Sequence, residues 1–178
     1  MKYLVCVLTA VTLLGACGGG GGSDGVPGSW SGLATQFIQL GEEVNDTDYT
    51  TVAQMRTDSS ATYRGVAAYG EGAVLSSAEM RANFSDASIS GRLHNFQAHD
   101  GTPITGEVAI RDGAITGAEY AAELAGGISV SGRRYDVSGN VYGDFLGDRA
   151  EMIDGEINGW LNSEHDSYYF DGLMVLRE

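Results

Sequence analysis

The sequence predicts an all-β protein whose main body is a roughly eight-stranded antiparallel, soluble β-barrel. Three observations support this prediction. Apolar and polar residues alternate with a period of two from about residue 61 onward, turn-forming residues interrupt the alternation at short intervals, and glycine recurs on the apolar face. Ahead of the barrel we expect a short irregular segment, and ahead of that segment an export signal.

Residues 1–16 have the pattern of a bacterial lipoprotein signal peptide. A positive start at Lys2 is followed by an almost unbroken apolar stretch that ends at Leu14, which is too short to span a bilayer comfortably. The sequence Leu14-Gly15-Ala16-Cys17 resembles a lipobox, in which the cysteine receives a diacylglycerol. The sequence therefore predicts lipidation at Cys17. The alternative is an ordinary signal peptide with an incidental cysteine.

Residues 17–28 form the predicted lipidated cysteine and a glycine-rich tether. Five consecutive glycines follow Cys17, a composition typical of flexible linkers. Such a tether gives a globular domain the slack to clear a membrane. The predicted location is therefore the outer membrane, through a lipid anchor, with the surface-exposed and periplasmic faces both left open.

The net charge of the chain limits the classes of partner that it can bind. Asp and Glu number 24 against 10 Lys and Arg, which gives a formal net charge of −14. Nucleic acid and anionic membrane surfaces are poor partners for such a chain. No cysteine follows Cys17, so the domain has no disulfide or thiolate site.

Residues 29–60 have the least regular pattern. The apolar residues in their first part fit either a short helix or an irregular strand; they are Trp30, Leu33, Phe37, Ile38 and Leu40. The sequence GEEVNDTDYTT, residues 41–51, predicts an acidic loop.

Residues 61–178 contain about eight strands by pattern. Ile104, Val108 and Ile110 share one face of their segment, for example, while polar residues occupy the other. SDAS, HDGTP, RDG and LGDRA are the expected turns. The segment SSAEMRANF also has a mild helical pattern, but a strand continues the alternation seen downstream.

Glycine on the apolar face distinguishes these strands, most clearly in Val137-x-Gly139-x-Val141-x-Gly143-x-Phe145. Because glycine weakens a strand, its recurrence needs a steric reason, which a narrow barrel with sharply coiled strands supplies. An open sandwich with glycine bulges is the alternative. The opposite faces are charged or polar, which argues against a membrane-spanning barrel; they carry Arg92, Glu107, Asp136, Asn140, Asp144, Asp154 and Glu156.

Four segments carry a resemblance to a known family. ATYRGVAAYG, ANFSDASISGRLHNF, SGNVYGDFLGDRAEMIDGEINGW and DGLMVLRE resemble the β-barrel domain of transferrin-binding protein B-like lipoproteins. Asp148 departs from the family pattern, in which proline is usual, and the expected loops are too short for transferrin to be the ligand. The resemblance implies a binding role at the outer membrane, where related lipoproteins bind haem, haemoglobin or complement regulators.

Five residues are candidates for ligand binding. His94, His99 and His165 are the only histidines, and Tyr168 and Tyr169 follow His165 closely. An imidazole could ligate haem or a metal, and exposed aromatic rings could anchor a flat ligand or a protein. The alternatives are surface histidines in loops and aromatic residues that pack at the barrel rim. No zinc-binding spacing supports a metal site, and we expect no cofactor.

Catalysis is not expected. The carboxylate pairs Asp46 with Asp48, Asp148 with Glu151 and Asp154 with Glu156 fall in turns or on the wet face, where we expect every carboxylate to be ionised. No nucleophile elbow, phosphate-binding loop or calcium loop is present.

The sequence therefore favours an outer-membrane-anchored lipoprotein that acts as a binding module for a protein, haem or another iron source. The alternatives are a structural envelope lipoprotein without a nutrient ligand and a lipocalin-like carrier with an internal cavity.

Overall fold

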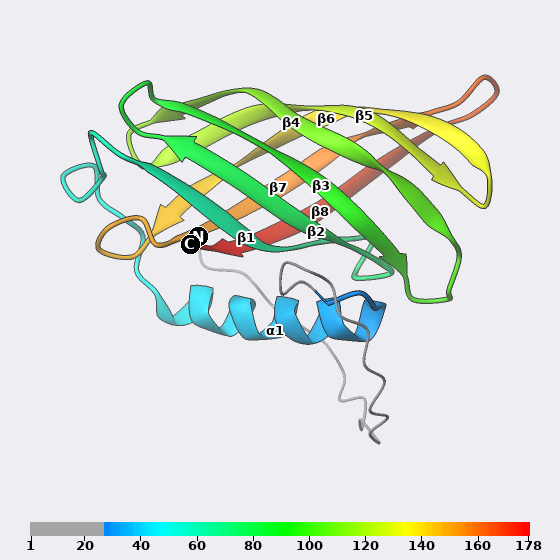
Figure 1. Cartoon of the computed structure of the whole chain (residues 1–178), viewed down its shortest axis with the longest axis horizontal. Helices are drawn as coiled ribbons and strands as arrows, with labels where there is room; N and C mark the ends of the chain where they lie inside the picture. The colour runs from blue at the N-terminus through cyan, green and yellow to red at the C-terminus, as the bar shows by residue number, and fades with distance from the viewer. Residues whose placement is uncertain (1–26) are drawn as a thin grey trace.

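The computed structural model describes residues 27–178, which form one helix and a closed barrel of eight strands (Figure 1). Each strand is antiparallel to the next along the chain, and β8 pairs back with β1. This closure confirms the predicted barrel and rules out the open sandwich. The strands are β1 (Ser60–Tyr69), β2 (Val74–Asn83), β3 (Ser88–Ala98), β4 (Ile104–Thr116), β5 (Glu119–Val130), β6 (Arg133–Leu146), β7 (Met152–Asn162) and β8 (Ser167–Arg177).

The period-two alternation sets the two faces of the barrel wall. On β6, Val137, Val141 and Phe145 are buried inside, while Asp136 and Asn140 are exposed outside. The segment with the mild helical pattern lies in β2, as the alternation predicted.

One predicted turn is wrong. The RDG segment lies inside β4, where the pairing with β5 shifts between Arg111 and Ala114. Asp112 has a positive φ of 53°, so the extra residues form a β-bulge rather than a chain reversal. The reversal between β4 and β5 comes later, at Gly117, which has a φ of 65°.

Side chains fill the interior of the barrel. Towards one end, Tyr63, Phe84 and Tyr120 surround Phe145, with ring centroids 5.6 to 6.0 Å from its own. A second aromatic group is centred on Tyr69, whose ring lies 6.3 Å from Phe96 and 6.0 Å from Phe170. Offset and tilted rings at these distances pack favourably, so aromatic contacts from opposite strands cross the lumen.

Close approach of neighbouring strands explains the inward glycines. A Cβ atom on Gly143 would overlap the backbone carbonyl of Asp154 on β7, and one on Gly139 would overlap that of Asn158. The coiled neighbouring strand therefore occupies the space that a side chain would need. The glycines do not leave a cavity at these positions.

The first part of the N-terminal segment is a helix, one of the two alternatives that its apolar residues allowed. The helix α1 (Trp30–Asp46) begins after Ser29, whose hydroxyl oxygen accepts a hydrogen bond from the Gly32 backbone N–H at 3.2 Å. It includes the first six residues of the predicted acidic loop. Leu33, Phe37, Leu40 and Val44 form one apolar stripe at helical spacing, which outweighs the polar composition of the helix C-terminus.

The stripe packs α1 against the outside of the barrel (Figure 1). Leu33 lies with Val66 and Leu75, and Leu40 lies with Leu146 and Val175. The helix thus covers parts of β1, β2 and β8 and also packs against the ends of β6 and β7, at Leu146 and Met152. Within residues 27–178, no helix has the length and apolar character that a membrane crossing requires.

Residues 47–59, here called the strap, connect α1 to β1 across one end of the barrel. Thr50 donates its backbone N–H to the Phe145 carbonyl at 2.9 Å and its hydroxyl to the Gly147 carbonyl at 2.6 Å. Further along, Arg56 pairs with Glu178 and lies over the ring of Phe84. These contacts fix the strap to the β6–β7 connection and the end of the chain.

Candidate functional site

The outer face of β6, β7 and β8, here called the β6–β8 face, is the most distinctive surface of the described chain. Strand register aligns its residues in rows across the three strands, because directly paired residues point the same way. Successive rows contain Ser138, Trp160 and Tyr169; Asn140, Asn158 and Asp171; Tyr142, Glu156 and Leu173; and Asp144, Asp154 and Val175. The helix α1 packs on Val175 in the last row and, with the strap, borders Asp144 and Asp154 beside it.

An aromatic pair lies at one end of this face. Trp160 and Tyr169 are directly paired, and their rings are 5.4 Å apart at an angle of 70°. Their exposed fractions are 48% and 59%. Large aromatic side chains that remain this exposed contribute nothing to the core, so they are available to a partner.

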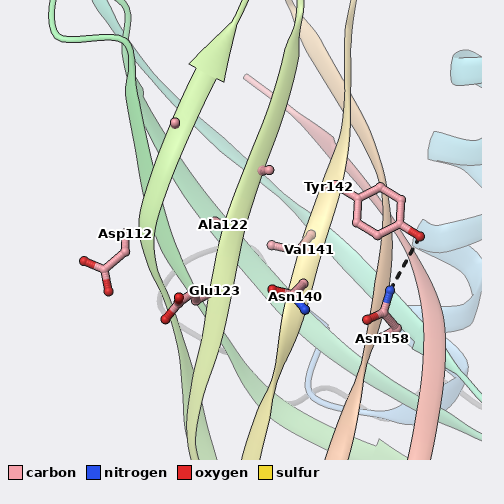
Figure 2. Close-up of a pocket in the computed structure, with 9 residues that line it drawn as sticks. Asp112, Ala122, Glu123, Asn140, Val141, Tyr142 and Asn158 are labelled. Carbon is pink, nitrogen blue, oxygen red and sulfur yellow. Dashed lines mark hydrogen bonds between the residues drawn. The ribbon is translucent and has the colours of Figure 1, made fainter.

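Tyr142 lies on the same face, two rows away from the aromatic pair. Its hydroxyl donates to a Glu156 carboxylate oxygen at 2.8 Å, and the Asn158 amide donates to the same hydroxyl at 3.5 Å. Figure 2 shows the contact of Asn158 with Tyr142 beside a shallow hollow on β4–β6, with Asn140 between Tyr142 and the acidic side chains of Glu123 and Asp112. The outward alanines Ala114 and Ala121 form the floor of this hollow because they are shorter than their neighbours.

A second hollow lies at the other end of the β6–β8 face, between α1, the strap and the strands. It is lined by Tyr49 from the strap, Asp144 and Asp154 from the paired strands, and the apolar side chains of Val44 and Leu173. Asp154 also accepts a hydrogen bond from the Asp144 backbone N–H at 3.2 Å. The hollow therefore combines negative charge with aromatic and apolar walls.

Burial changes the acidity of this second hollow. Burial, together with the nearby charge of Asp144, raises the pKa of Asp154 to about 6, although the hydrogen bond from the Asp144 backbone N–H opposes this rise. Burial also raises the pKa of Asp144, while the charge of Asp154 raises the pKa of Tyr49. Asp154 is therefore a partly buried carboxylate beside the strap and α1 rather than an ordinary surface group, although a pKa of about 6 leaves most of it ionised at pH 7.

The central rows of the β6–β8 face are negative and contain no basic side chain, because Arg134 and Arg177 lie at the ends of β6 and β8 and pair with Asp136 and Glu43. Within residues 27–178, none of the carboxylates of Asp144, Asp154, Glu156 and Asp171 lies within 4.0 Å of a basic nitrogen. On β4 and β5, by contrast, Arg111 pairs with Asp112 and lies 4.0 Å from Glu123.

The three predicted histidines lie at separate places. His94 is on β3 and partly buried, while His99 follows β3 and stacks edge-on against Trp30 at 4.5 Å. His165 is exposed in the β7–β8 connection. In the part of the chain that the structure describes, no three His, Cys, Asp or Glu residues are grouped so that they could hold a metal ion. The histidines remain candidates individually, but the fold does not bring them together.

The two predicted tyrosines, Tyr168 and Tyr169, point to opposite faces of β8. Tyr169 points outward to Trp160, whereas Tyr168 belongs to the inward row and packs on Tyr135 at the barrel mouth, with centroids 6.1 Å apart. Their proximity in sequence therefore does not make one site. Tyr142 and Trp160, which do share a face with Tyr169, lie 27 and 9 residues earlier in the chain, and only the strand register associates them. Cys17, the predicted lipidation site, lies outside the described residues.

Comparisons with known proteins give a remote likeness. No protein-family model matches the chain, and no curated protein matches it. Two similar solved structures are crystal structures of the vaccine antigen transferrin-binding protein B from Haemophilus parasuis, one a single mutant and the other a double mutant. Their identities to this chain are 15% and 16%, and their TM-scores are 0.49 and 0.47. Each match covers 72% of this chain but only 28% and 27% of the respective structures, so the chain spans less than a third of their length. A likeness at this level of identity says nothing about the ligand, partner or activity of this chain.

Proposed function

We propose that this protein is a binding module for a protein ligand, held at the outer membrane by a lipid on Cys17. The observation that carries the proposal is the β6–β8 face, where exposed aromatic rings and unbalanced carboxylates lie together on a rigid sheet. Exposed aromatic residues of this kind are typical anchors in protein interfaces. The glycine-rich tether in the sequence agrees with a domain that must reach a partner beyond the membrane.

The packed interior supports an external site over the carrier alternative. Aromatic side chains from strands that are not neighbours, such as Tyr63 on β1 and Phe145 on β6, meet in the lumen, and the neighbouring backbone fills the space beside the inward glycines. A lipocalin-like ligand would have to displace these contacts. The separation of the three histidines likewise favours a protein ligand over haem.

Photo-crosslinking in cells tests the proposal. A crosslinking amino acid is placed singly at exposed positions around the barrel, at Asn140 on β6, Glu107 on β4 and Arg64 on β1, in the otherwise unchanged chain. We expect one discrete adduct, strongest at Asn140, whose partner then binds the purified chain saturably. If no position gives an adduct and no saturable binding is found, a structural envelope role replaces the proposal.

Protease treatment of intact cells tests where the module acts. Loss of the domain from unbroken cells, with a periplasmic control protein intact, is the expected result for a receptor of external ligands. Full protection would place the domain in the periplasm and favour an envelope component as the partner.

A further inference from the structure

We propose that the β6–β8 face docks an extended segment of a partner protein that carries two basic side chains, Lys or Arg, about six residues apart. The proposal rests on the proposed binding function and gives its ligand a chemistry. Its basis is the charge of the face together with two receptive places at its ends. These are the aromatic pair of Trp160 and Tyr169 and the acidic hollow beneath Tyr49.

The aromatic pair suits a cation. Two rings at 70° form a corner that presents ring faces and edges in different directions, whereas a sugar stacks best on a flat ring surface. Ammonium and guanidinium groups bind the negative faces of Trp and Tyr, and the contribution grows when water is excluded. Asp171 lies in the next row, so a carboxylate is close to a cation held at the corner.

The acidic hollow provides the second place. Asp144 and Asp154 face it from paired strands, with the Tyr49 ring at its edge and no arginine paired with either carboxylate. Among the described titratable groups, Glu119 on β5 and Glu156 on β7 add further negative charge around these carboxylates. An incoming basic side chain would supply the counter-charge that the chain itself does not place there.

The spacing of the two places sets the spacing in the partner. Trp160 and Asp154 are six residues apart on β7, or about 20 Å along a strand. An extended partner segment that follows the strand would meet both places with side chains about six residues apart. Between them it crosses Asn158, Glu156 and Tyr142, which offer hydrogen-bonding groups.

Charge also argues against two other occupants. A second copy of the chain in a two-fold interface would bring one acidic face, with its Glu156 and Asp171, against another. An anionic lipid surface would meet the same repulsion. A basic protein segment is the occupant that the face complements.

Binding of designed peptides to the whole chain in neutral detergent tests the proposal. The probe is a capped Ser/Thr-rich peptide with two arginines six residues apart, and the control peptide has the same composition with the arginines adjacent. We expect the spaced peptide to bind about fivefold more tightly or better. Trp160→Ala and Tyr169→Ala should each weaken its binding about fivefold, as should Asp154→Asn. The matched charge control on β4, Glu107→Gln, should change it less than about twofold.

Three outcomes would overturn the proposal. The first is equal affinity for the two peptides, or affinity that is insensitive to the three variants, which would indicate attraction to net charge alone. The second is self-association of the chain that Trp160→Ala abolishes, and the third is a glycan that competes for the face. Any of these three outcomes would overturn the peptide proposal but not the proposed binding function, which the crosslinking experiment tests separately. If crosslinking finds no partner that binds saturably, the proposed binding function is overturned, while a measured preference for the spaced peptide would remain valid.

Discussion

At the scale of single residues, Asp154 is a carboxylate on the outer wall of the barrel whose ionised form is disfavoured by its surroundings. Its carboxylate is shielded by the strap and α1, faces Asp144, and has no basic partner among the described residues. The folded chain therefore holds a proton on Asp154 up to a pKa of about 6, compared with about 3.9 for an unfolded aspartate.

This pKa predicts a pH dependence of stability. Because the folded state binds the proton more tightly, the contribution of Asp154 is fully present below about pH 4 and is lost as the pH rises through 6. We expect Asp154→Asn to raise the free energy of unfolding at pH 7.5 by about 1–2 kcal/mol, reduced from the full linkage value by partial exposure, and by nearly nothing at pH 4. Urea unfolding of the wild type and the variant at both pH values measures this change in the free energy of unfolding. The control is Asp171→Asn on the same face, where the exposed carboxylate should leave both values nearly unchanged.

The inward glycines give a second prediction at this scale. Gly143→Ala should destabilise the protein by about 2 kcal/mol or more, because the new methyl group overlaps the Asp154 carbonyl and the strands must move apart. Gly127→Ala on β5 is the matched control, since its nearest neighbour is an Arg134 side-chain atom at 3.4 Å. The control should be neutral or slightly stabilising, as alanine is in a strand. Equal thermal shifts for both variants would contradict the explanation by close strand approach.

At the scale of elements, α1 depends on the barrel more than on its own sequence. Gly32 and Gly41 lie within it, and no acidic residue occupies its first turn, so its intrinsic stability is low. Its apolar stripe packs on β1, β2 and β8 instead, and the strap continues from its end to the β6–β7 connection.

Removing part of that stripe should therefore affect the whole fold. Leu33 is fully buried, and Leu33→Ala should cost about 2–4 kcal/mol in the free energy of unfolding. Ile38 lies on the same helix but is 40% exposed, and Ile38→Ala should cost much less, about 0.5–1 kcal/mol. We expect a single unfolding transition for both variants by fluorescence and circular dichroism. A separate early transition for the helix in the wild type would show that α1 is an independent unit.

At the scale of the whole molecule, the sequence predicted the barrel because alternation is a local property. Val137, Val141 and Phe145 indicate a buried face whatever strand lies beside them. The bulge at Asp112 was missed because the dipeptide Asp-Gly has the same composition in a bulge and in a turn. The helix was left open because its glycines and acidic residues obscure a stripe that spans only about three turns.

The candidate site could not be predicted in the same way. Tyr142, Trp160 and Tyr169 are brought together by the register of three strands, which the pattern of any one strand does not determine. The sequence instead drew attention to His165, Tyr168 and Tyr169, whose proximity along the chain is lost when the strand alternates its side chains between two faces. The raised pKa of Asp154 likewise depends on the strap, which is remote in sequence.

The proposed attachment to the membrane is testable at Cys17. The domain has its own packed core and a helix that seals part of the wall, so its folding should be independent of the lipid. We expect Cys17→Ser to abolish incorporation of labelled palmitate and to move the protein from the membrane to the soluble fraction. The melting temperature of the purified domain should not change. Peptide binding to the β6–β8 face should also persist, because β6, β7 and β8 build the face, α1 and the strap complete the hollow at its end, and none of these elements includes Cys17. Retention of Cys17→Ser in the membrane fraction would contradict the lipid anchor, and loss of peptide binding by a folded Cys17→Ser protein would contradict the location of the site.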